Sequence, residues 1–150
     1  AEGRLTKSGL PRQRLIFEVT ESATIADPAA AAAALRRFRD LGVAISMDDY
    51  GTGQSTLSYL KQLPLSELKI DRSFLQFAHR DQSDALLVRS TINLAHELGL
   101  SVVAEGVEEE ECLEFLRQVG CDYAQGYLIG KPMSAGDLEA LIATDLARAA

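Results

Sequence analysis

Two adjacent carboxylates, Asp48 and Asp49, stand at the end of a short apolar run and just before a Gly-Thr-Gly segment. The run, residues 43–47, is typical of a strand buried on both faces, and glycines at that place stop a strand. Neighbouring side chains of a strand point to opposite faces, but at a strand end both carboxylates can lean toward one point. Two close carboxylates repel each other unless a cation lies between them, and hard divalent cations prefer carboxylate oxygens. The pattern therefore indicates a cation site, with an Asp-Asp-x-Gly turn as the alternative.

Polar groups recur at the ends of the other predicted strands. In a (β/α)8 barrel the carboxyl ends of the parallel strands meet at one rim, where catalytic groups lie. Acidic groups outnumber the single lysine at these strand ends, so their convergence would describe a cation site. The alternatives are that Glu21, Asp71 and Glu108 are solvated rim residues and that Lys69 makes a structural salt bridge. The residues at the strand ends are Glu18 with Glu21, Asp48 with Asp49, Lys69 with Asp71, Glu105 with Glu108, and Gln125.

Strands and helices are predicted to alternate along the chain. Several helices end on glycine before the next strand begins, at Gly42, Gly99 and Gly120. This order implies a parallel sheet with right-handed crossovers. It predicts an α/β fold, a (β/α)8 TIM-type barrel of which this chain supplies about five βα units, and an open doubly wound sheet is the alternative. The predicted strands are 15–20, 43–47, 67–71, 101–106 and 123–126, and the predicted helices are 28–40, 54–63, Ser83 or Asp84 to 98, 109–119 and one from Ser134 or Ala135.

The composition narrows the classes of protein. A chain of 150 residues with 47% hydrophobic residues fits one domain with a buried core. Its net charge of −7 argues against duplex nucleic acid as a partner. The two cysteines, Cys112 and Cys121, are expected to be reduced core thiols of a cytoplasmic domain, and the parent protein can still be membrane-attached. His79 and His96 fall on predicted helices without a matching partner, so no chemistry is assigned to them.

Six segments in this order resemble the EAL-domain family of cyclic di-GMP phosphodiesterases: FEVTES, SMDDYGTGQSTL, LPLSELKIDRSF, VVAEGVE, DYAQGY and KPM. The resemblance covers the chain from Leu15 to Leu141. It implies a (β/α)8 barrel that uses Mg²⁺ or Mn²⁺ in a two-metal site to hydrolyse cyclic di-GMP to linear pGpG. It also implies a homodimer, and it is compatible with an upstream sensory or GGDEF-type domain.

The resemblance also implies roles for individual residues. Lys69 resembles the catalytic lysine that holds the attacking water, and Glu105 resembles the catalytic glutamate near the second metal and that water. The loop that couples dimerisation to metal binding is matched by Glu21 with Gly51, Thr52 and Gly53. The residues that match metal ligands are Glu18, Asp48, Asp49 and Glu105, and those that match substrate-binding positions are Asp71, Glu108, Gln125 and Pro132.

Two departures from the family pattern are visible. The Glu-Ala-Leu motif and the asparagine-bearing strand after it are absent, so we expect both to lie upstream of Ala1 and the chain, residues 1–150, to be the C-terminal part of the domain. Five βα units cannot close an eight-stranded barrel, so this piece alone is expected to be inactive and to aggregate or pair with another copy. In the loop, Tyr50, Gln54 and Thr56 replace the more usual Phe, Tyr and Ser, which bears on dimer coupling.

Two other functions compete with hydrolysis of cyclic di-GMP. A non-catalytic cyclic di-GMP receptor would keep the fold and lose metal ligands, but the matching ligands in this chain are retained. An unrelated Mg²⁺ barrel enzyme could use Lys69 as a base that abstracts a proton next to a carboxylate.

Overall fold

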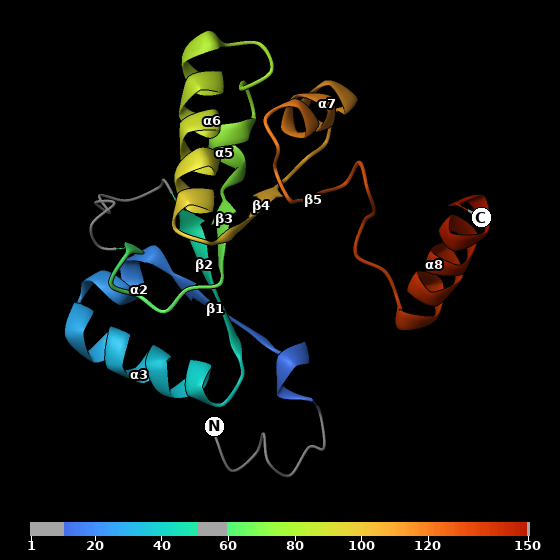
Figure 1. Ribbon diagram of the computed structural model, residues 1–150. Helices are drawn as coiled ribbons and strands as arrows, with labels where there is room; N and C mark the ends of the chain where they lie inside the picture. The colour runs from blue at the N-terminus through green and yellow to red at the C-terminus, as the bar shows by residue number, and fades with distance from the viewer. Residues whose placement is uncertain (1–10, 51–59, 150) are drawn as a thin grey trace.

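The computed structural model describes residues 11–50 and 60–149. Within these residues, the strands form one parallel sheet in the order β1-β2-β3-β4-β5 (Figure 1). Each strand lies beside its neighbours in sequence, without the reversal of strand order that marks a doubly wound sheet. This progression is the one expected of a barrel segment. The strands are β1 (Ile16–Thr20), β2 (Ala44–Tyr50), β3 (Glu67–Ile70), β4 (Ser101–Glu105) and β5 (Tyr123–Gln125).

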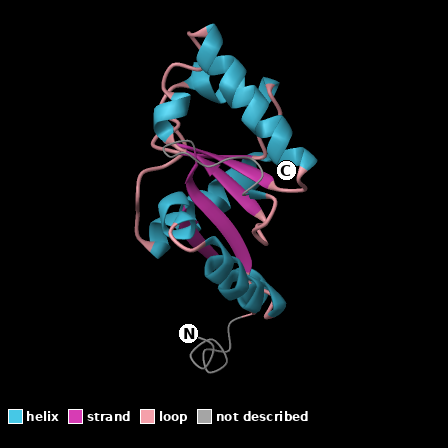
Figure 2. Ribbon diagram, turned by 90° about the vertical axis from the view of Figure 1, so that its left-hand side faces the viewer, coloured by secondary structure: helices cyan, strands magenta, loops and turns pink. Residues whose placement is uncertain are grey.

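Helices separate most of the strands, which confirms the predicted α/β architecture (Figure 2). Contacts join α3 to β2, and α5 and α6 to β4. A single 3₁₀ turn, η1 (Arg12–Arg14), precedes β1. The α-helices of the described residues are α2 (Glu21–Ile25), α3 (Pro28–Asp40), α5 (Arg72–Leu75), α6 (Gln82–Glu97), α7 (Glu110–Gln118) and α8 (Ala135–Ala149).

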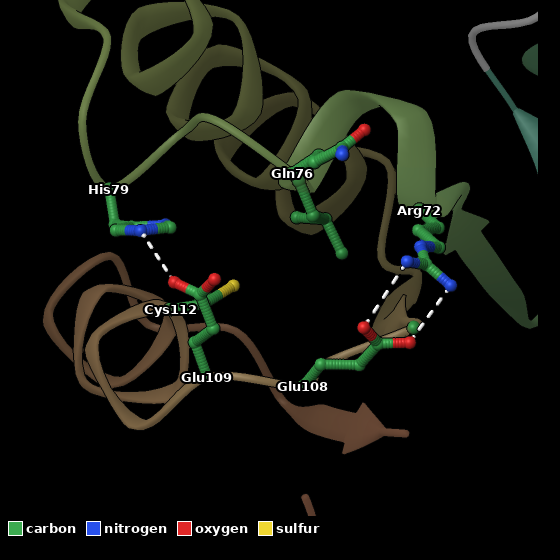
Figure 3. Close-up of a pocket in the computed structure, with 8 residues that line it drawn as sticks. Arg72, Gln76, His79, Glu108, Glu109 and Cys112 are labelled. Carbon is green, nitrogen blue, oxygen red and sulfur yellow. Dashed lines mark hydrogen bonds and ion pairs between the residues drawn. The ribbon is translucent and has the colours of Figure 1, made fainter. Parts of the chain in front are cut away.

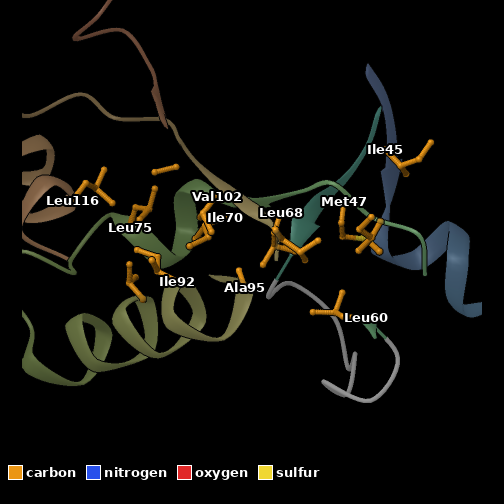
Figure 4. Close-up of a cluster of buried hydrophobic side chains, with 14 of the residues drawn as sticks. Ile45, Met47, Leu60, Leu68, Ile70, Leu75, Ile92, Ala95, Val102 and Leu116 are labelled. Carbon is orange, nitrogen blue, oxygen red and sulfur yellow. The ribbon is translucent and has the colours of Figure 1, made fainter. Parts of the chain in front are cut away.

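The core lies on the helix-covered face of the sheet (Figure 4). Along β2, Ile45 and Met47 are fully buried on this face, and Leu68 of β3 pairs with Met47 in the register. Side chains alternate along a strand, so the residues between them belong to the opposite face. That opposite face carries Ser46 and Lys69, which are polar and also buried.

The helix ends follow local capping rules. α3 begins at Pro28, as predicted, and Asp27 caps it, because its side chain accepts a hydrogen bond from the Ala30 amide. The predicted start of α6 at Ser83 or Asp84 is wrong, because α6 begins at Gln82. Asp81 is the cap, because its carboxylate accepts from the amides of both residues at 2.8 and 3.0 Å.

Other sequence predictions differ from the structure in extent. β2 continues through both aspartates to Tyr50, where the sequence predicted an end at Met47. The short helices α2 and α5 were not predicted, because one or two turns carry no apolar period. Of the predicted helix 54–63, residues 54–59 lie outside the described residues.

The segment after β5 is more exposed to solvent than the rest of the described chain. Leu138, Leu141 and Ile142 of α8 are exposed, and Figure 1 shows α8 apart from the sheet. Within the described ranges, no helix has both the length and the apolar character that crossing a membrane requires.

Candidate active site

The ammonium group of Lys69 lies between carboxylates from three other strands. Its Nζ is 2.7 Å from Oε1 of Glu105, 2.9 Å from Oε1 of Glu18 and 3.3 Å from Oδ1 of Asp48. Only 8% of the Lys69 side chain is exposed, whereas 55% of the Glu18 side chain is. Three oxygens that close to one nitrogen are also close to one another, so the structure brings together the acidic residues that the sequence placed at one rim.

The sheet register puts these side chains on one face. Glu18 pairs with Ser46 and Lys69 with Val103, while Glu105 pairs with Gln125. One layer deeper, Ser46 donates a hydrogen bond from Oγ to Oε1 of Glu67 at 2.8 Å. This face is therefore a polar surface from the strand interiors to their carboxyl ends, opposite the apolar core.

A β-bulge lies at the two aspartates of β2. The pairing with β3 shifts between Met47 and Tyr50, and Asp49 has a φ of 57°, in the left-handed region. Aspartate tolerates this conformation better than most residues, and the Asp49 amide donates to Oδ1 of Asp48 at 3.1 Å. The bulge breaks the strict alternation of side chains along β2 at these two positions.

The charges around Lys69 decide its protonation. Burial works against the charged form, but hydrogen bonds to Glu105 and Glu18, with the charges of Glu105 and Asp48, raise the pKa of Lys69 above its usual range. A lysine that keeps its proton donates hydrogen bonds and cannot take up a proton. This arrangement argues against the alternative in which Lys69 abstracts a proton from a carbon acid.

The donor chemistry of Glu18, Asp48 and Glu105 fits a hard divalent cation, because all their contacting atoms are carboxylate oxygens. Their arrangement is centred on the Lys69 ammonium. Across residues 11–50 and 60–149, no group of three or more His, Cys, Asp or Glu side chains is placed to hold a metal by itself.

Two rim residues are engaged in local contacts. Oδ1 of Asp71 accepts hydrogen bonds from the hydroxyl and the amide of Ser73, which lower the pKa of Asp71. Both carboxylate oxygens of Glu108 pair with the Arg72 guanidinium, at 2.8 and 3.2 Å. Their predicted role in substrate binding would have to coexist with these contacts.

The remaining predicted residues differ in exposure. Gln125, at the end of β5, and Pro132 are exposed. Glu21, the first residue of α2, is only 2% exposed, and its charge contributes to the raised pKa of Tyr50, after the larger effect of burial. Gly51, Thr52 and Gly53 lie outside the described residues.

The sequence prediction missed two polar contacts. One is the Ser46–Glu67 hydrogen bond, which the alternation of β2 and β3 could have suggested, since both residues fall on the polar face. The other is the pair of His79 and Glu109, with 3.1 Å between Nε2 and Oε2. The two residues are 30 positions apart, and His79 lies in a turn between α5 and α6 and not on a helix as predicted, so no local pattern indicates the contact.

The family model of the EAL domain matches residues 2–132 of this chain. The chain belongs to the EAL domain family. It is 47% identical over 139 residues to the bifunctional diguanylate cyclase/cyclic di-GMP phosphodiesterase MucR of Pseudomonas aeruginosa, a match that covers 93% of this chain and 20% of MucR. The chain spans about a fifth of the length of the first curated relatives that it matches.

Solved structures of EAL domains share the fold. The MucR phosphodiesterase in complex with cyclic di-GMP superposes with a TM-score of 0.86 at 46% identity, over 91% of this chain and 56% of that one. BlrP1 of Klebsiella pneumoniae, in a complex with manganese and cyclic di-GMP, superposes with a TM-score of 0.81 at 32% identity, over 87% of this chain and 33% of that one. The predicted membership in the EAL family and the predicted class of fold are therefore confirmed.

Proposed function

We propose that this chain contributes the active-site strands of a phosphodiesterase that hydrolyses cyclic di-GMP to linear pGpG. The observation that carries the proposal is the Lys69 cluster, in which Glu18, Asp48 and Glu105 from three strands surround one buried ammonium group. Relatives named as cyclic di-GMP phosphodiesterases and a relative solved with cyclic di-GMP support the choice of substrate.

The carboxylates of Glu18, Asp48, Asp49 and Glu105 would hold the divalent cations, which we propose to be Mg²⁺ or Mn²⁺. Cations held there would supply positive charge for the phosphodiester and would lower the pKa of a bound water. They also explain how an acidic protein accepts an anionic dinucleotide. The manganese complex of BlrP1 supports a divalent metal in this family.

Lys69 and Glu105 would orient the attacking water. Lys69 is a hydrogen-bond donor at the centre of the carboxylates, so its ammonium would hold the oxygen of the attacking water. Glu105 lies closest to that ammonium and can accept a proton of the same water. Their fixed separation serves catalysis by positioning.

The rim would bind the nucleotide. We propose Asp71, Glu108, Gln125 and Pro132 as substrate contacts, from the carboxyl ends of β3, β4 and β5 onward. Glu21, with its electrostatic effect on Tyr50, would connect this rim to Gly51, Thr52 and Gly53 and so to a homodimer.

The test is a product assay on the complete EAL domain with Mg²⁺ or Mn²⁺, with cyclic di-GMP and pGpG separated by chromatography. We expect conversion to pGpG with metal and none with a chelator. Asp48→Asn should abolish conversion, because an amide oxygen carries no charge to hold the cations. The matched control is Asp40→Asn, the same change at the exposed end of α3.

Near-normal turnover in Asp48→Asn would refute its role as a metal ligand. Binding of cyclic di-GMP without any product in the unaltered domain would identify a receptor in place of an enzyme.

A further inference from the structure

A second group of ionisable side chains contains Arg72, His79 and Glu109, which have no role in the proposed function. It lines a pocket between the segment after β3 and the start of α7 (Figure 3). In this pocket the Glu109 carboxylate faces His79, and Arg72 pairs with Glu108 at the other side.

His79 is a buried polar side chain that the fold itself does not explain. Only 6% of the side chain is exposed. Neither ring nitrogen makes a hydrogen bond of normal geometry within the described part of the chain, although Nε2 is 3.1 Å from Oε2 of Glu109. A buried imidazole without a well-made hydrogen bond costs stability, so its placement calls for a reason.

Glu109 is equally unusual for its position. It is the N-cap residue of α7, where Ser, Thr, Asp and Asn are preferred, and its side chain makes no capping hydrogen bond. The carboxylate instead contacts His79 and Nη2 of Arg80, both from the segment after α5. The side chain of Glu109 therefore serves the contact between two segments and not its own helix.

Each of these two segments follows a strand that holds a residue of the candidate active site. The first follows β3, which holds Lys69, and the second follows β4, which ends in Glu105. Between Glu105 and Glu109 the backbone packs closely against Arg72. Gly106 has a φ of +69°, and a Cβ at this position would lie 2.7 Å from the Arg72 side chain. Only residues 106–108 separate Glu109 from Glu105, so a displacement at Glu109 would act on Glu105 through this short connection, and Oε1 of Glu105 is 2.7 Å from Nζ of Lys69.

We propose that His79 and Glu109 form a clasp that positions Glu105 relative to Lys69. The inference rests on the proposed function, since it assigns these two side chains to the geometry of that same site. They are positioning residues, because neither contacts the Lys69 cluster itself. The exposed Arg80–Glu109 contact adds little, because a solvated ion pair is weak, so the buried imidazole is the part of the clasp that matters.

The experiment compares three variants in the complete EAL domain. His79→Phe fills the space but removes the polar contact with Glu109, and we expect kcat to fall by about ten- to a hundredfold with little change in KM. His79→Gln retains a donor near the position of Nε2 and should restore most of kcat. Glu109→Gln should lie between them.

The matched control is His96→Phe. His96 also pairs with a carboxylate, with 2.8 Å from Nε2 to Oδ2 of Asp122, but this pair lies at the amino ends of β4 and β5. We expect this variant to leave kcat and KM unchanged. A His79→Phe variant with unchanged kcat, or a His79→Gln variant as impaired as His79→Phe, would overturn the clasp.

Hydrogen exchange separates failure of the clasp from failure of the proposed function. In His79→Phe, amides of residues 106–112 should exchange faster than in the unaltered domain, and those in His79→Gln should not. If the unaltered domain makes no pGpG, the proposed function fails while exchange still decides the clasp. Equal exchange rates in His79→Phe and the unaltered domain would refute the clasp.

Discussion

The two faces of the parallel sheet differ sharply in chemistry, although the same strands build both. The helix-covered face is apolar and closed, with Met47 and Leu68 fully buried. The opposite face holds Ser46, Glu67 and Lys69. This face is open to solvent at Glu18, whose side chain is exposed. Consecutive residues of one strand thus belong to different environments.

This difference separates stability from chemistry. Burial of apolar side chains under α3, α5 and α6 holds the strands in register. The register then sets the distances between charged groups on the other face. Substitutions on the first face should therefore act on the free energy of unfolding, and those at the carboxyl end of the second face on turnover.

The largest expected effect is on the charged face. Lys69→Ala in the complete EAL domain should lower kcat by about a thousandfold, as loss of a preorganised donor does, while binding of cyclic di-GMP is largely kept. Kinetics of pGpG formation and calorimetric titration would measure the two quantities. Lys61→Ala, at an exposed turn, is the control. Equal loss of binding and rate would contradict the assignment of Lys69 to the water.

Leu68→Ala tests the apolar face one residue away. Leu68 is fully buried, so the cavity left behind should lower the free energy of unfolding by about 2–5 kcal/mol. Denaturant unfolding measures this change. The folded fraction should retain kcat within a fewfold. A large drop in kcat at full folding would show that the two faces are not separable.

Ser46→Ala tests the polar face below the active site. The substitution leaves Oε1 of Glu67 without its 2.8 Å hydrogen bond, at a cost of about 1–3 kcal/mol. The loss should appear in denaturant unfolding and spare kcat, because Ser46 bonds to Glu67 and is not among the residues that contact the Lys69 ammonium. An increase in stability would mean that Glu67 finds water or another partner.

The smallest effect is expected at the amino ends of the strands. Burial would raise the pKa of Asp122, but hydrogen bonds from His96 and the Val102 amide lower it overall. A carboxyl with a depressed pKa stabilises the fold above its unfolded pKa of about 4, and that stabilisation is lost as the pH falls through the folded value. The stability difference between the unaltered domain and Asp122→Asn should therefore shrink below about pH 4, as thermal unfolding across pH would show. A difference that stays constant across this range would contradict the predicted linkage.

Much of the fold follows from local patterns in the sequence. Alternating apolar stretches and glycine-ended helices predicted the parallel strands, and Asp27-Pro28 predicted the start of α3. The start of α6 was missed, because Asp81, Ser83 and Asp84 are all good capping residues and only the backbone path selects one. The bulge at Asp49 was missed as well, since it arises from the pairing of β2 with β3.

The sequence predicted which residues belong to the candidate site but not how their side chains are arranged. Strand ends indicated that Glu18, Asp48 and Glu105 share a rim, which is where the structure places them. The central position of Lys69 was not foreseen, and neither was the contact of His79 with Glu109. These depend on side-chain directions between elements that local periodicity does not describe.

By itself, the sequence determined which residues of each strand are apolar and which charged residues stand at the strand ends, because both are properties of neighbours along the chain. Only the tertiary structure decided which charges meet. Lys69 and Glu18 are 51 positions apart, and their 2.9 Å contact exists because the parallel register places β1 and β3 on either side of β2.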